Sequence, residues 1–331
     1  MVRVSVIIPT YNRAHIVGEA IASVLAQTFG DFEVIVIDDG SSDDTSAVVG
    51  KCRDARVRYF RQPNRGLPGA RNRGIAEARG DIVSFLDSDD LWKPEKLERE
   101  VRFFGACPET DAVFADAEEV FLDGGTVASV MRASPGMRAF LQRAPRDGGL
   151  VISQRAFYLM MLTEQPVKPS ALALRRSTLE ELGGFDERMR IMEDWELLLR
   201  LARKRGIGYI NRALTVMRLS RDSLHLSDPQ RTLDYGLAGM SRERKLLRAG
   251  DNEALAASAQ GINWICTFVS YQHQGRGEAR AAIRASLRGW LITREPWLLI
   301  RAASLLLPRG LRARAKARLS RGRGSAPEAA T

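Results

Sequence analysis

The sequence has few cysteines and no long apolar run, and each shortage excludes a class of protein. Its 331 residues include three cysteines, at positions 52, 107 and 266. They are odd in number and lack metal-site spacing, which favours a reducing compartment over a disulfide scaffold. No stretch reaches the roughly 18 apolar residues of a membrane-spanning helix. The amino-terminal apolar run is short and broken by Pro9, which argues against a secretory signal. We therefore expect a cytoplasmic protein.

Positive charge is concentrated at the carboxyl end of the chain. Of the net charge of +10, residues 290–331 carry +7. The remainder is nearly neutral, which argues against a nucleic-acid-binding surface. Basic residues in the tail accompany an apolar helix pattern, which suits the surface of an anionic bilayer. We expect peripheral membrane association, with a helical lid or a subunit contact as the alternative and oligomerisation left open. The apolar positions are Trp290, Trp297, Leu298, Leu305 and Leu306.

The first 116 residues alternate between short apolar runs and helical patterns. This alternation is typical of a mostly parallel sheet with helices on both faces. Strands are predicted at residues 4–8, 32–37, 57–60, 81–86 and 111–114, and helices at 14–26, after 45, up to 78 and at 94–104.

The pattern changes twice after residue 116. Residues 117–165 predict loops and a helix at 154–162, followed by further strands at 171–174 and 207–217. After Ser227 the pattern is helical, and Ile283, Leu287, Trp290 and Leu291 form an apolar stripe. We therefore divide the chain into parts covering residues 1–116, 117–227, 228–320 and 321–331, the last of them disordered.

A run of acidic residues follows one predicted buried strand. Asp87 and Asp89 flank Ser88 directly after the apolar segment 81–86. In open α/β sheets, ligands bind at the carboxyl ends of the strands. Two carboxylates in such a crevice need compensating charge, and Mg²⁺ typically uses one or two carboxylates plus substrate phosphates. The run predicts a metal–diphosphate site, although a solvated acidic turn would have the same composition.

Two other strand ends carry residues that suit a nucleobase. Strand one ends in Pro9-Thr-Tyr11, and strand two ends in Asp38-Asp39. An aromatic ring stacks on a base, and a carboxylate accepts a hydrogen bond from a ring N–H. Uracil, thymine and guanine have such a group, whereas cytosine does not. The alternative is that Tyr11 packs at the sheet edge and Asp39 caps a turn.

Two further segments carry candidate residues. A glycine-rich segment, residues 64–74, leads into a helix where Arg71 is placed to bind phosphate or a base edge. Glu193-Asp194 begins another helix. Asp194 fits a helix N-cap, but it also fits a general base, because a helix N-terminus keeps a carboxylate ionised.

Five motifs in order resemble those of the family 2 glycosyltransferases of the type A fold, over residues 1–220. They are Val4-Ser-Val-Ile-Ile-Pro-Thr-Tyr-Asn, Ile37-Asp-Asp-Gly-Ser-Ser, Ala70-Arg-Asn-x-Gly, Phe85-Leu-Asp-x-Asp-Asp and Gly183-Gly-Phe-Asp-Glu with Glu193-Asp-Trp. The resemblance implies a Rossmann-like α/β domain, here followed by a C-terminal helical region. It also implies metal-dependent, inverting transfer of a sugar from a nucleoside diphosphate, with a UDP-sugar favoured, to a hydroxyl of a glycan or lipid-linked acceptor.

The resemblance also implies roles for individual residues. Residues 1–116 would bind the nucleotide-sugar and 117–227 the acceptor. Asp89 would bind Mg²⁺ or Mn²⁺, Asp194 would be the general base, and Glu193 and Trp195 would lie on the acceptor side. The implied donor-binding residues are Pro9, Tyr11, Asp39, Arg71, Asp87 and Ser88.

The sequence departs from the family at one expected metal ligand. Many members carry a histidine two residues after an arginine that follows the last strand. Counting from Arg218, that position is Ser220, and His225 lies five residues further on. Either His225 reaches the metal, or Asp89 and phosphate oxygens suffice.

Other functions remain open at this point. A non-catalytic nucleotide-sugar-binding protein would keep the same crevice. A sugar-nucleotide nucleotidyltransferase would need a Gly-rich basic loop after strand one, where this chain has Tyr11-Asn-Arg-Ala. The Gln-x-x-Arg-Trp signature and membrane spans of processive synthases are not found, so we expect one sugar per encounter, in polysaccharide biosynthesis.

Overall fold

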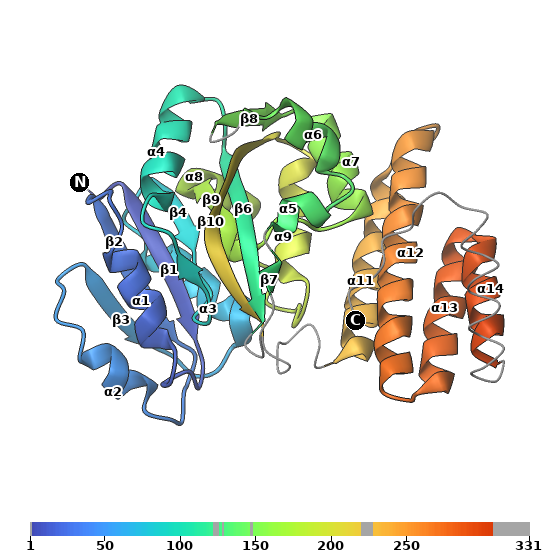
Figure 1. Cartoon of the computed structure of the whole chain (residues 1–331), viewed down its shortest axis with the longest axis horizontal. Helices are drawn as coiled ribbons and strands as arrows, with labels where there is room; N and C mark the ends of the chain where they lie inside the picture. The colour runs from blue at the N-terminus through green and yellow to red at the C-terminus, as the bar shows by residue number, and fades with distance from the viewer. Residues whose placement is uncertain (1, 122–125, 128, 146–147, 220–227, 307–331) are drawn as a thin grey trace. The chain divides into compact units, whose positions relative to one another are not determined.

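The computed structural model describes residues 2–121, 126–127, 129–145, 148–219 and 228–306. The chain forms two compact units, residues 1–223 and 224–331. The first unit contains a mixed sheet with helices packed on it, and the second consists of helices (Figure 1). Each unit is described by itself.

Four parallel strands form one half of the sheet. They are β1 (Val4–Thr10), β2 (Phe32–Asp38), β3 (Val57–Arg61) and β4 (Ile82–Phe85), in the spatial order β3-β2-β1-β4. All residues of β1, β2 and β4 are buried. Strands buried on both faces read as continuous apolar runs, which explains why the sequence predicts them well.

The other half of the sheet is mixed in direction. β9 (Leu172–Arg175) lies antiparallel between β4 and β6 (Ala112–Phe121), and β10 (Ile207–Leu219) runs parallel to β6. The short β5 (Leu91–Trp92) and β8 (Gly149–Ile152) pair antiparallel with β10, and β7 (Thr126–Val127) pairs with β6. The β5–β10 pairing brings the acidic run after β4 next to the end of β10.

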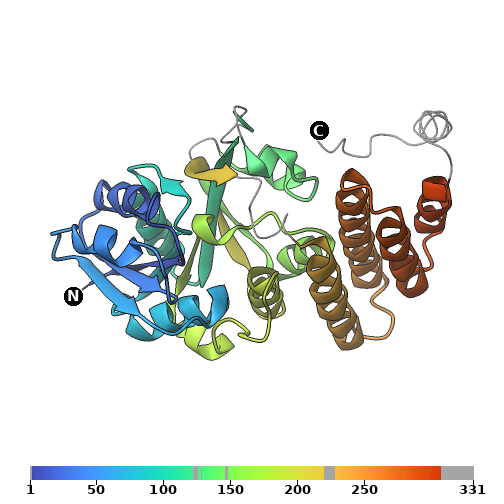
Figure 2. The same cartoon turned by 90° about the horizontal axis from the view of Figure 1, so that it is seen from below.

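Nine α-helices accompany the described part of the sheet. They are α1 (Val17–Leu25), α2 (Thr45–Gly50), α3 (Gly66–Glu77), α4 (Lys96–Ala106), α5 (Val130–Ala133), α6 (Arg138–Arg143), α7 (Gln154–Thr163), α8 (Arg176–Leu182) and α9 (Glu193–Ala202). The views of Figures 1 and 2 show them around the sheet. The glycine-rich segment is itself most of α3, where the sequence predicted a loop before a helix.

Close packing fixes the position of α3 against the sheet. A side chain at Gly74 would collide with Ile7 of β1, so the helix backbone lies directly on the strand. On the opposite face, α1 and α4 cover a larger apolar cluster that includes Val6, Val34 and Leu97. The helix that carries Arg71 is therefore held close to the strands that carry the candidate acidic residues.

The second unit packs its helices through small residues. Its helices are α11 (Pro229–Leu246), α12 (Asn252–Gly275), α13 (Ala279–Thr293) and α14 (Pro296–Leu306). The buried positions of α13 are Ala282, Ala285, Ser286 and Gly289. The predicted apolar stripe is thus not the buried face, because helices that pack closely leave room only for small side chains. At Gly289, a Cβ would lie 2.6 Å from Leu298 and 2.7 Å from Cys266.

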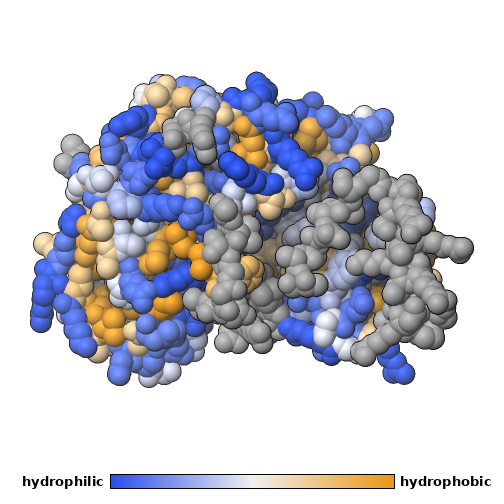
Figure 3. All heavy atoms as spheres, in the orientation of Figure 1, coloured by the Kyte–Doolittle hydropathy of each residue, from blue (hydrophilic) through white to orange (hydrophobic). Residues whose placement is uncertain are grey.

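The predicted bilayer-facing surface of the tail needs correction. Leu298, Leu305 and Arg301 are buried inside the helical unit, so they cannot contact a bilayer while it is folded. Leu306 is exposed, and the basic residues after it, with the predicted disordered end, lie outside the described residues. No helix in the described segments is long and apolar enough to cross a bilayer. On the face drawn in Figure 3, much of the surface of the first unit is hydrophilic, and groups of apolar residues lie between the hydrophilic ones.

Candidate active site

Three neighbouring parallel strands end at one edge of the sheet. β1 leads to Tyr11, β2 to Asp38 and Asp39, and β4 to Asp87. The register pairs Thr10 with Asp38, so these ends are level. The structure therefore brings together the strand-end residues that the sequence singled out.

Asp39 is held by the entrance of α3. Its Oδ1 accepts hydrogen bonds from the Gln62 side chain (2.7 Å) and the Arg65 backbone N–H (2.9 Å), and its Oδ2 accepts one from the Gly66 N–H (2.8 Å). The carboxylate thus caps the helix N-terminus. The Arg65 and Gly66 N–H groups at the helix entrance are therefore directed at the Asp39 carboxylate. Its Oδ2 keeps a lone pair for a further donor.

Tyr11 and Pro9 differ in exposure. Pro9 is buried within β1, whereas Tyr11 is 49% exposed just beyond the strand. The exposed ring is available for stacking, and buried Pro9 shapes the strand end without presenting a surface of its own.

Arg71 lies deeper than the sequence suggests. Its side chain is 1% exposed, and its guanidinium donates to Asp87 Oδ1 (2.8 Å) and Glu193 Oε1 (2.7 Å) and lies over the Phe185 ring. Burial by itself lowers the pKa of Arg71, but the charges of Asp87, Glu193 and Asp194 outweigh it and raise the pKa above its ordinary value. The expected direct contact with the nucleotide is replaced by a contact that fixes Asp87.

The start of α9 joins this network. Glu193 is buried, and burial raises its pKa to about 7 despite the opposing charge of Arg71. The neighbouring Asp194 accepts hydrogen bonds at Oδ2 from Gln165 (2.6 Å) and at Oδ1 from the Trp195 N–H (2.8 Å). Asp194 is therefore held in a fixed orientation in the first turn of α9.

Trp195 does not fit the acceptor contact we expected. It is buried, and its indole N–H donates to the Met161 carbonyl at 2.6 Å. It packs α9 against the segment that carries α7. Glu193 is also too buried to meet an acceptor, and its partner is Arg71.

The acidic turn after β4 is held from three directions. The Asp87 N–H donates to Ser170 Oγ at 3.0 Å, and Ser88 is buried. The Arg218 N–H donates to Asp90 Oδ1 at 3.1 Å, and its guanidinium donates to the Asp89 carbonyl. Asp90, Ser170 and Arg218 are not among the residues predicted from the sequence. Asp90 directly follows the predicted pair, but no local pattern connects Ser170 or Arg218 to this turn.

The turn has the electrostatics of a cation site. Burial and the charge of Asp87 raise the pKa of Asp89. Burial and the charges of Asp87 and Asp89 raise the pKa of Asp90 well above its usual range. A divalent cation would relieve this crowding of negative charge. The described segments contain no group of three or more His, Cys, Asp or Glu side chains that could hold a metal. Asp89 with substrate phosphates fits the Mg²⁺ pattern, and His225 and Ser220 lie outside the described residues.

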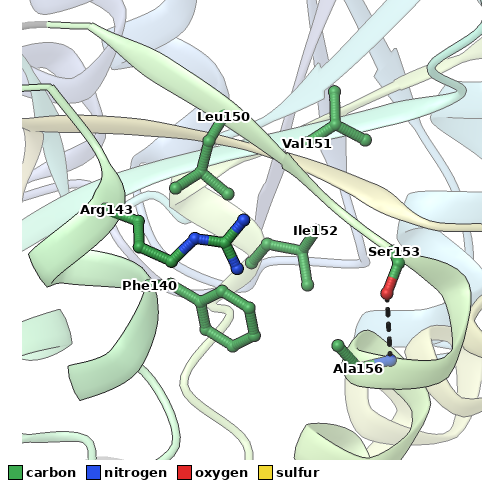
Figure 4. Close-up of a pocket in the computed structure, with 7 residues that line it drawn as sticks. All are labelled: Phe140, Arg143, Leu150, Val151, Ile152, Ser153 and Ala156. Carbon is green, nitrogen blue, oxygen red and sulfur yellow. Dashed lines mark hydrogen bonds between the residues drawn. The ribbon is translucent and has the colours of Figure 1, made fainter.

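A hollow in the surface lies elsewhere. Its lining comes from α6, β8 and the start of α7 (Figure 4), namely Phe140, Arg143, Leu150, Val151, Ile152, Ser153 and Ala156. β8 pairs with residues 207–210, the beginning of β10, whereas Arg218 near its end holds the acidic turn. The hollow is therefore separate from the acidic site.

Comparison with known proteins places this geometry in a family. Residues 5–161 match the model of glycosyl transferase family 2. An uncharacterized glycosyltransferase of Rickettsia felis is 34% identical over 232 residues, 69% of this chain and 35% of the relative. The chain thus spans about a third of the length of that relative. UDP-Glc:alpha-D-GlcNAc-diphosphoundecaprenol beta-1,3-glucosyltransferase WfgD of Escherichia coli is 41% identical over 99 residues, 30% of this chain and 39% of the relative.

Solved structures share the fold at lower identity. S. aureus TarS 1-349 in complex with UDP-GlcNAc has a TM-score of 0.63 and 21% identity, covering 86% of this chain and 81% of TarS 1-349. Mannosyltransferase PcManGT from Pyrobaculum calidifontis, in complex with GDP-Man and Mn²⁺, has a TM-score of 0.56 and 19% identity. The match covers 94% of this chain and 82% of PcManGT. These similarities confirm the predicted type A fold. Because the family model, the curated relatives and the fold agree with the order of the motifs, the chain contains a glycosyl transferase family 2 domain that includes residues 5–161.

Proposed function

We propose that this chain is a nonprocessive, inverting glycosyltransferase that moves a sugar from a nucleoside diphosphate to a hydroxyl of a glycan or lipid-linked acceptor. One observation carries the proposal. The buried guanidinium of Arg71 joins Asp87, at the end of β4, to Glu193, at the start of α9. This link supports a site in which Asp87 serves the donor and Asp194, next to Glu193, serves the acceptor.

The donor side follows from the strand ends. Tyr11 stacks on the base, and Asp39 accepts a hydrogen bond from a base N–H. Asp87, held by Arg71 and still partly exposed, accepts hydrogen bonds from the ribose hydroxyls. Uridine is the base that we favour. WfgD is named for UDP-Glc, and TarS binds UDP-GlcNAc in its complex. The PcManGT complex with GDP-Man makes guanosine the next candidate.

The leaving group is a nucleoside diphosphate, whose growing negative charge must be neutralised. A divalent cation at Asp89, Mg²⁺ or Mn²⁺, would supply that electrostatic stabilisation. Arg218 and Ser170 keep the acidic turn in place for this task. The Mn²⁺ in the PcManGT complex supports the choice of cation class.

Asp194 is the proposed general base. Its carboxylate would take the proton of the acceptor hydroxyl as the oxygen attacks the anomeric carbon on the face opposite the diphosphate. A single displacement of this kind inverts the configuration. The Gln165 side chain and the Trp195 N–H hold the carboxylate in its orientation. A positioned base typically contributes about 10²–10⁴-fold to the rate.

The acceptor is proposed to be lipid-linked. WfgD, which is similar to this chain over 99 residues, is named for a diphosphoundecaprenol acceptor. The charge of +7 on residues 290–331 would suit an anionic membrane surface, where such an acceptor is found. Residues 1–116 are assigned to the donor, and residues 117–227 to the acceptor.

Thermal shift with nucleoside diphosphates tests the proposal. UDP, GDP, TDP and CDP are added with and without Mn²⁺ to the wild type and to Asp89→Ala. Ligands that bind only the folded state stabilise it by about 2.7 kcal/mol at a hundredfold excess over Kd. We expect a shift for one base that needs the metal and is lost in Asp89→Ala. The absence of any shift in the wild type would contradict the proposal.

A further inference from the structure

The segment between α8 and α9, residues 183–192, is fastened to α3. The Asn72 side chain donates to the Phe185 carbonyl (2.9 Å) and accepts from the Phe185 N–H (2.8 Å). Arg65, just before α3, donates to Glu187 Oε2 at 2.7 Å. The segment therefore lies along the same helix whose N-terminus is capped by Asp39.

Arg190 of this segment rests against the entrance of α3. A Cβ placed on Gly66 would lie 2.7 Å from Arg190 Nη1, so the guanidinium occupies the space that a side chain at this position would need. The N–H of the same glycine donates to Asp39 Oδ2. One residue thus separates the guanidinium from the Asp39 carboxylate.

The guanidinium of Arg190 is available to a ligand. It is exposed, and within the described ranges no hydrogen-bond or ion-pair partner contacts it. Arg188 in the same segment differs, because it forms an ion pair with Asp186 at 2.8 Å. The nearby Glu187 is bound to Arg65 and Asn72. Arg190 is the cation that this segment presents beside Asp39.

We propose that Arg190 determines base specificity by donating a hydrogen bond to the ring carbonyl next to the N–H that Asp39 binds. This inference rests on the proposed donor site. The Asp39 carboxylate accepts and the Arg190 guanidinium donates. Together they match the adjacent N–H and C=O groups on the edge of uracil or guanine. Cytosine presents a bare ring nitrogen and an amino group there, so Asp39 would meet a lone pair and Arg190 an N–H. Asp39 and Arg190 together would therefore select uracil or guanine and reject cytosine.

Binding of UDP, GDP, CDP and inorganic diphosphate, each with Mn²⁺, tests this role by calorimetry. The variants are Arg190→Ala, Arg190→Lys and Arg188→Ala, the last removing an equal charge from the same segment. We expect Arg190→Ala to weaken the tighter of UDP and GDP about 10-fold or more relative to Arg188→Ala. Inorganic diphosphate should bind both variants equally, and Arg190→Lys should restore part of the loss.

Several results would overturn the inference. Equal nucleotide affinity in Arg190→Ala and Arg188→Ala would remove Arg190 from the donor site. An equal loss for inorganic diphosphate would place it at the phosphates instead, and a wild type that binds CDP most tightly would reject the base-edge argument while leaving the transferase proposal intact. A wild type that binds no nucleotide would overturn both.

Discussion

Each of the two units contains a buried arginine. One arginine has charged partners and the other has neutral partners. In the α/β unit, Arg71 donates to two carboxylates, Asp87 and Glu193. In the helical unit, Arg301 donates to Ser270 (3.1 Å) and Gln274 (3.5 Å) and lies 3.6 Å from the centre of the Tyr271 ring. Burial lowers the pKa of Arg301, whereas the surrounding carboxylates raise that of Arg71.

This difference separates the charge network of the proposed active site from a network that only joins two helices. Neutral partners are enough to join α14 to α12 in the helical unit. The ionic network gathers carboxylates at a strand end and a helix start, where burial makes their charges unfavourable unless they are paired. Such crowding of like charges is expected where a protein prepares a site for ligands and protons.

The largest effect should come from removing the proposed base. Asp194→Asn keeps an oxygen that can accept from Gln165 but no longer takes a proton, so we expect turnover to fall about 10²–10⁴-fold. Sugar transfer, or release of the nucleoside diphosphate, measures the rate. Arg301→Met is the control from the structural network and should keep the rate. Full activity in Asp194→Asn would break the functional interpretation of the ionic network.

The two arginines should differ in stability. Arg71→Met leaves buried Glu193 and half-buried Asp87 without their cationic partner, so we expect a loss of about 3–5 kcal/mol in the free energy of unfolding of its unit. Arg301→Met leaves Ser270 bonded to the Ala282 carbonyl and should lose only about 1 kcal/mol. Urea unfolding of both variants tests the difference, and equal losses would show that the two networks are energetically alike.

The stability of the α/β unit should depend on pH through Glu193. Its pKa is about 7 in the folded protein and 4.5 in an ordinary environment, so the folded state binds this proton more tightly. The contribution of Glu193 to stability is therefore complete below pH 4.5 and declines as pH rises to 7, by at most about 1.4 kcal/mol per pH unit. Glu193→Gln should lack this decline. Parallel unfolding curves for wild type and variant across this range would contradict the raised pKa.

The smallest effect concerns the entrance of α3. Gly66 has a φ of +80°, so Gly66→Ala should lose about 1–2 kcal/mol and also displace Arg190. Gly183→Ala is the matched control, since Gly183 has a φ of +76° and open space around its α-carbon. Chemical denaturation compares their stabilities, and nucleotide affinity should fall only in Gly66→Ala. An equal affinity in both variants would show that the Gly66–Arg190 contact does not matter for binding.

Local patterns predicted the strand ends but not the partners of the residues there. The strands that lead to Asp39 and Asp87 are continuous apolar runs, and parallel strands bring their ends together, so both positions could be placed. Arg71 and Glu193 are 122 positions apart, and Arg218 and Asp90 are 128 apart. Contacts over such distances depend on the antiparallel pairings of β5 and β9, which no local periodicity specifies.

The same limit applies to the helices. The stripe on α13 that includes Ile283 and Leu287 marks it correctly as a helix. Hydrophobicity alone misplaces its buried face, because close approach of helices favours Gly289 and Ser286 over large side chains.

The attachment of residues 183–192 to α3 fixes how long this segment must be. Phe185 and Glu187 are tied to Asn72 and Arg65, and Glu193 is tied to Arg71 of the same helix. The length of residues 183–192 is therefore fixed by their attachment to α3, and Asp194 follows directly after the last attached residue, Glu193. Insertions and deletions should be rare in this segment among related sequences. One residue more or fewer would shift the proposed base, Asp194, away from the proposed donor site.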